Sequence, residues 1–446
     1  MKDQYILATY SNQKDTNCRV LVYPNITYSK DLEKDSYIVV LKNTIEQINK
    51  VRDDIHWVVL TPTGKQVASL NLPNVEQREI EIPTYPNRMR THFKPDEILK
   101  VIDWRNEDFD ILYSHLPEQT LALTNLLRNT TNINPKVVGY CHWFEVDGNT
   151  NYKKRMLRQN LSGILEMDEC GVNSIWLKEL VIEESKKMLS EEDVERLKEI
   201  LQPHYLGIDS ISTDHEYEPK SILFNHRGDY YTGWKWFVKQ MDELYKKRQD
   251  FKVYTTLEHL DRPYAEKLNI SSREDYLKYI SKMHMGVGCF KRYSAWSIST
   301  TDGLSQGVPY VLPNKLCYPE MVGKDYPLLY EEKDFLSTIE SMLDNPNLRQ
   351  EVKDYLEPKL PDFMWSNRVL KWFDNWKIFD EYKLANETDS YKKIKKLVKT
   401  NKTITKNQIT TEFNWGVRID LNGYRNRLRN EKDIRLTKNR YEVIEK

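Results

Sequence analysis

The chain has 446 residues, of which 30% are charged and 39% hydrophobic, and its formal net charge at pH 7 is zero. This length exceeds that of one ordinary hydrophobic core, so we expect two or three domains. The sequence has no run of 18 apolar residues, which excludes a membrane-spanning helix, and its start, MKDQYILATYS, lacks the apolar stretch of a secretory signal.

The cysteines are spread along the chain without the CxxC spacing of metal sites, and several stand in apolar, strand-like runs. Thiols in such runs are typical of reduced core residues in a cytoplasmic protein. We therefore expect no metal site. The cysteines are Cys18, Cys141, Cys170, Cys289 and Cys317.

Short apolar runs alternate with amphipathic stretches through most of the chain. The first series of expected strands is Tyr5–Thr9, Arg19–Tyr23, His56–Thr61, Ile111–His115, Val137–His142 and Gly163–Met167. The second series is Ile222–Asn225, Phe251–Thr256, Met285–Phe290, Val308–Leu312 and Leu328–Tyr330. The helical patterns between them include Asp96–Ile102, Thr120–Leu127, Trp176–Met188, Trp234–Lys247 and Phe335–Leu343.

This alternation predicts an α/β protein with parallel sheets covered by helices. Two series of strands indicate two Rossmann-like lobes, which we place at residues 1–201 and 202–361. Ligands of such sheets bind at the carboxyl ends of the strands, so we expect the substrate in a cleft between the lobes.

The segment Tyr293–Gly323 carries the clearest chemical signal. A short helix is expected to open on Ser297, Ile298, Ser299 and Thr300, and a helix N-terminus favours an anion. Asp302 stands one turn further on, within reach of a hydroxylated group beside that anion. A phosphate next to sugar hydroxyls describes a nucleotide sugar.

Several motifs in this half resemble the donor lobe of GT-B-fold retaining glycosyltransferases of family 4. Gly207-Ile208-Asp209 resembles the Gly-Val/Ile-Asp before that lobe's first strand, and Arg227 after the next strand resembles the arginine that holds the donor diphosphate. Asp302–Pro309 resembles Glu-Ala-x-Ala-x-Gly-x-Pro, and Glu320–Gly323 resembles Glu-x-x-Gly. The resemblance implies the GT-B fold, a bound UDP-sugar such as UDP-glucose, and contact between Asp302 and the ribose.

The sequence departs from the family pattern at two positions. Ser294 stands where the family has a Glu that contacts the transferred sugar, and Thr232 stands where a lysine approaches the diphosphate. Lys235, Lys291 or Arg292 could supply the missing charge, or each could be a surface residue. These departures leave the identity of the sugar open.

In the first lobe, the expected strand Val137–His142 ends in a histidine, followed by Glu145 and Asp147. The resemblance implies that His142 lies against the donor sugar, although a lone histidine after a strand is also a common structural residue. Glu145 and Asp147 are candidates to take a proton from the acceptor hydroxyl.

The pattern at 362–384 predicts a helix with three tryptophans, either a crossover helix that packs back on the first lobe or the last core helix of the second. A polar linker, Ala385–Ser390, follows it. Residues 391–446 then hold 16 Lys and Arg against 6 Asp and Glu, whereas the preceding 390 residues have more acidic than basic groups. Such asymmetry indicates a basic module on a mildly acidic body.

Three short helices and two strands are expected in this module, namely Tyr391–Lys399, a helix capped by Thr405, Leu421–Asn430 and the two halves of IRLTKNRYEVI. The pattern resembles a winged helix-turn-helix, and Arg and Asn are side chains that read base edges. A basic surface that docks on protein or membrane and a passive tail are the alternatives. The expected DNA-binding residues are Asn422, Arg425, Asn426, Arg429, Lys438 and Arg440.

Together these features predict a glycosyltransferase without a required cofactor or metal, in which a basic module binds double-stranded DNA. The pattern resembles phage enzymes that glycosylate hydroxymethylated bases, which implies a phage-infected bacterial cell. A bacterial polysaccharide or glycolipid glycosyltransferase with a docking tail is the first alternative. A non-catalytic binding protein with a transferase fold is the second, because of Ser294 and Thr232.

Overall fold

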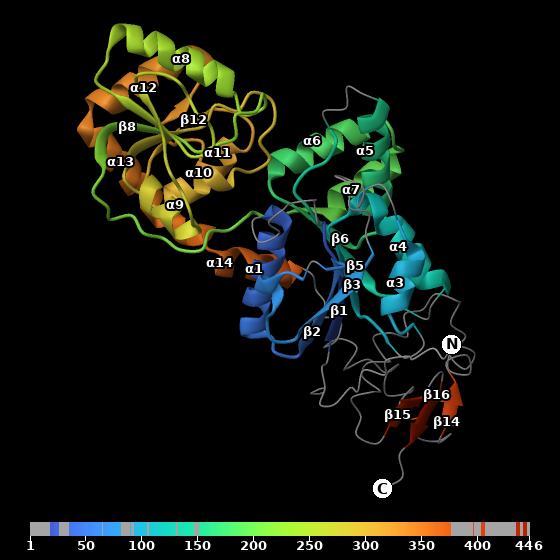
Figure 1. Ribbon diagram of the computed structural model, residues 1–446. Coiled ribbons are helices and arrows are strands. Elements are labelled where there is room, and N and C mark those ends of the chain that lie inside the picture. The colour runs from blue at the N-terminus through green and yellow to red at the C-terminus, as the bar shows by residue number, and fades with distance from the viewer. Residues whose placement is uncertain are drawn as a thin grey trace. The chain divides into compact units, whose positions relative to one another are not determined.

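The structure is a computed structural model (Figure 1), and it describes residues 18–25, 35–64, 66–81, 90, 93–104, 107–130, 133–146, 151–375, 396, 403–405, 434–437 and 440–443. The chain divides into two compact units. The first contains the described parts of Met1–Tyr140, Arg155–Cys170 and Phe373–Lys446, and the second contains those of Cys141–Lys154 and Gly171–Trp372. The boundary between the two units crosses strands of the first sheet, at Tyr140 and at Cys170.

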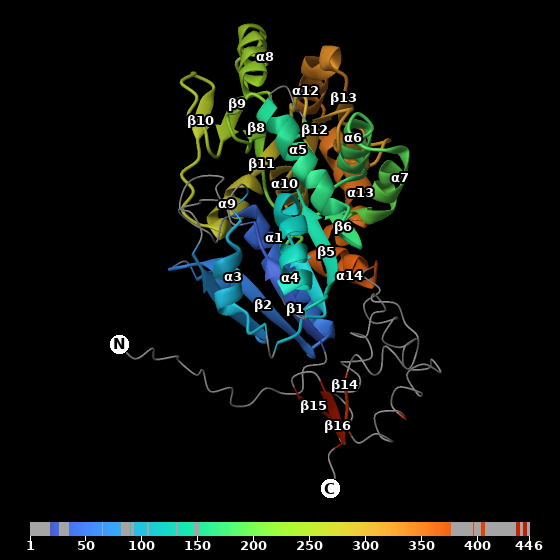
Figure 2. The same cartoon turned by 90° about the vertical axis from the view of Figure 1, so that its right-hand side faces the viewer.

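The first sheet has seven strands in the order β3-β2-β1-β4-β5-β6-β7. The pairs β1–β2, β1–β4, β2–β3 and β4–β5 are parallel. In Figure 1, α1 lies on one face of this sheet and α3 and α4 lie on the other, and Figure 2 shows α3 and α4 in front of the strands. Nearly every residue of β1, β4 and β5 is buried, as expected for a parallel sheet with both faces covered.

The elements of the N-terminal half alternate between strands and helices, except that a 3₁₀ turn joins β2 to β3 and two helices separate β6 from β7. In chain order they are β1 Cys18–Tyr23, α1 Ser36–Val51, β2 Ile55–Pro62, the 3₁₀ turn Ala68–Leu70, β3 Val75–Ile80, α3 Pro95–Val101, β4 Ile111–Ser114, α4 Pro117–Thr130, β5 Lys136–Cys141, α5 Asn151–Ile164, β6 Glu169–Val172, α6 Ile175–Ser185, α7 Glu191–Ile200 and β7 Leu201–Pro203.

The second sheet has six strands in the order β10-β9-β8-β11-β12-β13, and all of its pairings are parallel. Figure 1 shows α8 and α12 on one side of it and α9 and α10 on the other. Its elements are β8 Glu218–Phe224, α8 Trp234–Lys247, β9 Lys252–Thr255, β10 Ala265–Lys267, α9 Arg273–Ile280, β11 Met283–Val287, α10 Ile298–Ser305, β12 Tyr310–Pro313, α11 Tyr318–Val322, β13 Leu329–Tyr330, α12 Phe335–Asp344, α13 Pro346–Leu356 and α14 Trp365–Asn375, with 3₁₀ turns at Glu332–Asp334 and Glu357–Phe363.

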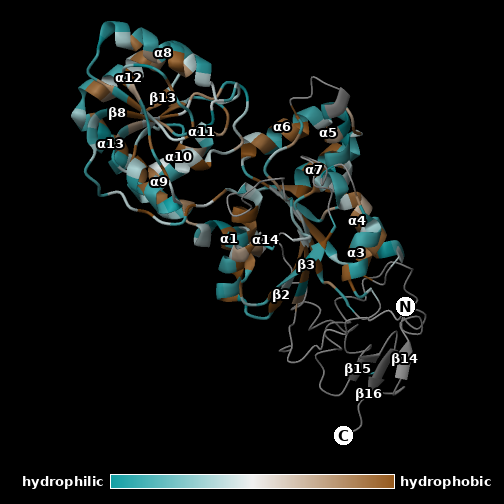
Figure 3. Ribbon diagram, viewed as in Figure 1, coloured by the Kyte–Doolittle hydropathy of each residue, from teal (hydrophilic) through white to brown (hydrophobic). Residues whose placement is uncertain are grey.

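Helix α8 illustrates why the sequence covers this sheet as it does. Phe237, Met241 and Leu244 recur at helical spacing and are the buried residues of the helix. Phe237 stacks on Phe224 of β8, with ring centroids 4.7 Å apart. Figure 3 shows the result as hydrophobic strands at the centre of the sheet and hydrophilic stretches along α8.

Helix α14 packs on the second unit through two of its tryptophans. Trp365 lies against Gly207, where a side chain would clash with the indole ring, and Trp372 stacks on His204 with ring centroids 5.0 Å apart. The expected continuation of this helix beyond Asn375 lies outside the described residues.

A third, small antiparallel sheet has the order β14-β16-β15, with strands Thr403–Thr405, Arg440–Val443 and Ile434–Thr437. It confirms the two strands expected in IRLTKNRYEVI. Thr405, expected as a helix cap, instead ends β14. Of the three helices expected in the basic module, the structure describes one residue, Lys396 of Tyr391–Lys399, and this residue is helical; the expected helix Leu421–Asn430 and the residues after Thr405 in the second helix lie outside the described residues.

One expected strand is wrong. Gly163 and Ile164 belong to helix α5, and the strand of this region is β6, a few residues later. Periodicity cannot separate a short apolar run in a strand from the buried end of a helix. Gly163 lies so close to the carbonyl of Pro117 that no side chain would fit there. Helix α1 and strand β3 were not predicted, and the expected strand Tyr5–Thr9 lies outside the described residues.

Within the described part of the chain, no helix combines the length and the apolar character needed to cross a membrane.

A left-handed glycine at the start of α8 provides a test of the second unit. Gly233 has φ +75°, and an added Cβ would overlap the carbonyl oxygen of Cys289. Gly233→Ala should therefore cost roughly 3 kcal/mol or more in unfolding free energy. Gly64 has φ +69° with no atom within 4 Å of an added Cβ, so Gly64→Ala should cost only about 1 kcal/mol. Denaturant titration measures both, and equal losses would contradict this packing.

Candidate functional site

The candidate site lies at the carboxyl ends of β8 and β11, the two central strands of the second sheet. From β8 the chain goes to β9 on one side, and from β11 it goes to β12 on the other side. Ligands of such sheets bind where the strand order reverses in this way. Residues 225–233 and 288–297 follow the two strands, and all of them belong to the second unit.

The N-terminus of α10 offers free amides at this edge. Ser297 is its N-cap: the Oγ atom of Ser297 accepts from the N–H of Thr300 at 3.3 Å and from Thr300 Oγ1 at 2.9 Å. No hydrogen bond in the described part of the chain uses the N–H of Ile298 or Ser299. The predicted anion site therefore keeps two amides of the first turn, while Ser297 and Thr300 cap the helix.

Asn225, directly after β8, fixes the first turn of α10. Its Nδ2 donates to the carbonyl oxygen of Ser299 at 2.8 Å and to the hydroxyl of Tyr276 at 2.8 Å, and its Oδ1 accepts from Tyr310 Oη at 3.1 Å. This buried network joins β8, α9, α10 and β12. Sequence reasoning missed it, although a polar residue at the end of a buried strand is a recognisable signal.

Asp302 is buried, with 3% of its surface exposed. Its carboxylate receives both ends of the Arg273 guanidinium, Nη1 to Oδ2 at 2.6 Å and Nη2 to Oδ1 at 2.7 Å. Burial raises the pKa of Asp302, and the bonds from Arg273 oppose that rise. Sequence reasoning identified Asp302 and missed Arg273, although a cation in the first turn of α9 opposes the helix dipole and so calls for a partner.

The loop after β8 presents one exposed cation and closes on itself through Thr232. Arg227 is exposed, and no hydrogen bond of the described residues involves its guanidinium. Thr232 is buried, and its hydroxyl lies 2.7 Å from the carbonyl oxygens of both Arg227 and Asp229. Thr232 thus shapes the loop, while Lys235 is exposed on the first turn of α8.

Ser294 is buried after β11. Its Oγ is 3.6 Å from Cys317 Sγ and 3.4 Å from Tyr318 Oη, at the start of α11. Both contacts are long, so Ser294 fills space where the family resemblance implies a longer acidic side chain.

A polar cavity of about 240 Å³ lies at the carboxyl ends of β11, β12 and β13. Lys291 borders it, donates to Glu332 at 2.8 Å and covers the ring of Trp236 at 4.1 Å from its centroid. Lys291 is therefore already paired. The other residues that line the cavity are Cys289, Phe290, Pro313, Asn314, Lys315, Tyr330 and Glu331.

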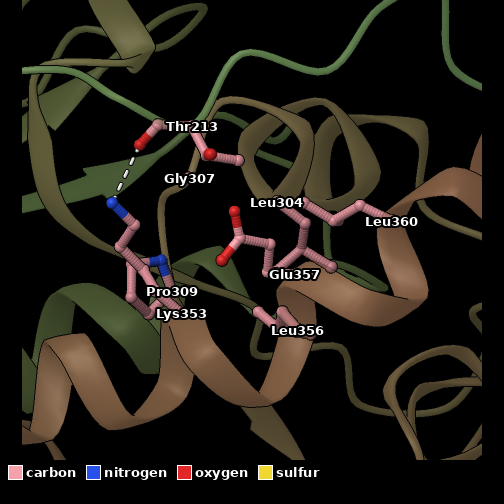
Figure 4. A pocket seen from close by; sticks show the side chains of 8 residues that line it. All are labelled: Thr213, Leu304, Gly307, Pro309, Lys353, Leu356, Glu357 and Leu360. Atoms are coloured by element: carbon pink, nitrogen blue, oxygen red, sulfur yellow. Dashed lines mark hydrogen bonds between the residues drawn. The ribbon is translucent and has the colours of Figure 1, made fainter.

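A second cavity, behind α10, is too small for a substrate (Figure 4). Its volume is about 10 Å³, room for one water molecule. Gly307 adopts φ +71° beside it, and an added Cβ would lie 2.6 Å from the carbonyl oxygen of Thr213. Lys353 donates to that same oxygen at 2.9 Å.

The residues expected from the first half of the chain lie just after β5. The carbonyl oxygen of His142 accepts from Asn173 Nδ2 at 3.2 Å, and burial lowers the pKa of the imidazole to about 3. The ring of Trp143 meets that of Tyr293 edge-on, with centroids 5.5 Å apart. Because of its low pKa, His142 is neutral at physiological pH. Glu145 is half-buried, and Asp147 lies outside the described residues.

The predicted DNA-binding residues are largely beyond the described part of the chain. Arg440 opens β16. Asn422, Arg425, Asn426, Arg429 and Lys438 lie outside the described residues.

Comparison with solved structures places the fold among known glycosyltransferase structures. Anabaena HepE in complex with UDP and glucose is 10% identical, with a TM-score of 0.58 over 80% of this chain and 98% of that chain. A glycosyltransferase from Rickettsia africae is 12% identical, with a TM-score of 0.58 over 81% and 98%. The lipopolysaccharide outer core galactosyltransferase WaaB is 12% identical, with a TM-score of 0.55 over 82% and 99%. These likenesses show the GT-B fold, whereas the sequence matches no protein-family model and no curated protein.

A buried histidine beside the site gives a pH test. The pKa of His226 is lowered from 6.5 to about 4 by burial, although a bond to the carbonyl oxygen of Val287 partly opposes this. Between these two pH values the unfolded state binds more protons, so the folded state loses up to about 1.4 kcal/mol per pH unit as the pH falls. His226→Gln removes this loss, so the stability gap to wild type should narrow from pH 7.5 to pH 5.

Urea titrations at both pH values measure that gap, and the exposed His259→Gln serves as the control. A pKa near 6.5 for the imidazole of His226, measured by NMR titration, would contradict the burial described above.

Proposed function

We propose that the protein is a glycosyltransferase that moves a sugar from a UDP-sugar to an acceptor hydroxyl. One observation carries the proposal: helix α10 presents two free amides at the reversal of strand order and a buried carboxylate one turn later. Amides at a helix N-terminus suit a diphosphate, and a carboxylate suits the ribose hydroxyls of the same molecule. The shared fold with HepE, solved with UDP and glucose, supports this choice of ligand.

The proposed chemistry divides the work among a few groups. The amides of Ile298 and Ser299 and the side chain of Arg227 would stabilise the diphosphate as it leaves. Asp302 would hold the ribose, and Lys235 would add positive charge near the phosphates. The family resemblance adds retention of the anomeric configuration and no required metal; within the described residues, no group of three His, Cys, Asp or Glu side chains could hold one.

His142, Glu145 and Asp147 remain the candidates on the acceptor side. A neutral His142 can accept or donate one hydrogen bond to a sugar hydroxyl. It does not supply positive charge. We therefore assign it orientation of the sugar, and assign deprotonation of the acceptor to one of the two carboxylates.

We infer that the acceptor is a hydroxymethylated base of double-stranded DNA. The basic composition of residues 391–446 supports this, because a module with an excess of Lys and Arg neutralises phosphates. The hairpin β15–β16 is consistent with the wing of a winged helix. An enzyme of this kind reaches its target hydroxyl in the major groove or by turning the base out of the stack.

A saccharide acceptor is the alternative, and the likeness to WaaB, a lipopolysaccharide galactosyltransferase, favours it. In that case the basic residues would dock on anionic membrane lipid. A non-catalytic binding protein is the remaining possibility, since Thr232 shapes a loop and Ser294 is buried.

Loss of the buried carboxylate should weaken donor binding. Asp302→Asn removes one charged acceptor, and hydrogen bonds to charged groups contribute about 1.5 to 3 kcal/mol, so the Kd for UDP-glucose should rise at least about tenfold. Isothermal titration calorimetry measures it. Asp242→Asn is the matched control, because Asp242 also pairs with an arginine of the same unit, Arg262, at 2.8 Å. Equal affinities of Asp302→Asn and wild type would contradict the assignment.

The acceptor is tested by mass. The protein is incubated with a panel of nucleotide sugars and with duplex DNA that contains hydroxymethylcytosine, hydroxymethyluracil or neither, and the digested nucleosides are weighed. We expect a hexose or pentose mass gain on a hydroxymethylated base only. Arg425→Ala with Arg429→Ala should reduce the gain at physiological salt by weakening DNA binding. Donor binding without any mass gain on DNA would favour the saccharide acceptor.

A further inference from the structure

The carboxylate of Asp302 is held by Arg273, a residue that has no role in the chemistry proposed above. Arg273, at the first position of α9, grips Asp302 with two parallel hydrogen bonds of 2.6 and 2.7 Å. Asp302 is buried, whereas about half of the Arg273 side chain is exposed, 49% against 4% for the acid. The pair therefore reaches from the interior of the unit to its surface.

The guanidinium is itself fixed from two sides. Its centre lies 5.4 Å from the ring centroid of Tyr276, and its Nη2 is 3.3 Å from Asp209 Oδ2. Tyr276 is held in turn by Asn225, whose Nδ2 donates to its hydroxyl at 2.8 Å. Arg273 is thus held in one orientation, which is the condition for a planar, two-pronged contact.

The two bonds leave acceptor positions unused on the same carboxylate. Each oxygen of an ionised carboxyl group has two acceptor positions, and Arg273 uses one on each. A pair of neighbouring hydroxyl groups, as in a ribose, can donate to the remaining two. A protonated carboxyl group would instead present a donor and would lose part of this capacity.

We propose that Arg273 is a positioning residue of the donor site, which keeps the buried Asp302 ionised and turned so that it accepts from the vicinal hydroxyls of the donor ribose. The proposal rests on the proposed function, because it concerns the same site. Arg273 acts through Asp302 and needs no contact with the reacting atoms.

The proposal makes donor affinity independent of pH near neutrality. The groups that face Asp302 are Arg273 and Tyr276 from α9, Asp209 from the segment before β8, and Tyr310 from β12. Only Arg273 is a cation among them, while Asp209 opposes ionisation. Without Arg273, burial and Asp209 raise the pKa of Asp302 against only the hydrogen bond from Tyr276, and the acid takes up a proton as the pH falls.

The test compares Arg273→Gln, Arg273→Lys and the control Arg262→Gln in the full-length protein. Arg262 forms an equivalent pair with Asp242 on the surface of the same unit. For Arg273→Gln we expect the Kd for UDP to rise about tenfold or more at pH 7.5 and to rise further at pH 6. Arg273→Lys, which keeps the charge and loses the two-pronged contact, should lie between this variant and wild type. The control should match wild type at both pH values.

A second probe separates positioning from a general loss of structure. Wild type should bind 2′-deoxy-UDP several-fold more weakly than UDP, and this difference should shrink in Arg273→Gln, because the acid no longer accepts from the ribose. In Asp302→Asn, a further Arg273→Gln change should have little effect on Kd, and the pH dependence should vanish.

The outcomes are distinct. Wild-type affinity in Arg273→Gln, or tighter binding, would overturn the proposal, and tighter binding would identify Arg273 as a competitor of the ribose. A pH-independent loss with an unchanged 2′-hydroxyl difference would reduce Arg273 to a structural role and would overturn it as well. If wild type binds neither UDP nor UDP-glucose, the proposed function fails first.

Discussion

A buried carboxylate must be protonated or paired with a cation. In this protein the pairing of Asp302 with Arg273 constrains how the second unit is assembled around its site. Burial raises the pKa of Asp302, and Arg273, which reaches it from the start of a neighbouring helix, opposes that rise. That contact requires α9 and α10 to begin at the same edge of the sheet. The Asn225 network then ties the first turn of α10 to β8 and β12. The free amides of Ile298 and Ser299 are held at this edge by the same contacts.

The contacts of Thr232 and Ser294 explain what these two residues do at the positions where the sequence departs from the family pattern. Thr232 uses its hydroxyl to close the loop after β8, so positive charge at the proposed diphosphate site must come from exposed side chains such as Arg227 and Lys235. Ser294 is buried against Cys317 and Tyr318 and has no carboxylate to offer to a sugar. A site of this composition depends on helix amides and on one paired acid more than on a cluster of cations.

Much of the second unit was predictable because its elements have strong local patterns. Helix α8 occurs at Trp234–Lys247 as expected, since its apolar residues recur at helical spacing and Gly233 starts it. Strands β8, β9, β11, β12 and β13 also occur within a few residues of their expected positions, because each is a short apolar run between polar loops. The run Gly163–Met167 failed, since a buried helix end and a buried strand share the same apolar composition.

Local sequence patterns were enough to predict the α/β class, the two series of parallel strands, and the location of a helix N-terminus followed by an acid at Asp302. These features are local, because they follow from periodicity, capping residues and spacing within one segment. The pairing of Asp302 with Arg273, the contact of Asn225 with α10 and the burial of Thr232 and Ser294 follow from the three-dimensional packing alone. Those contacts join residues far apart in the chain, Arg273 to Asp302 across α9, β11 and α10, and no local pattern encodes which distant side chain will neutralise a buried charge.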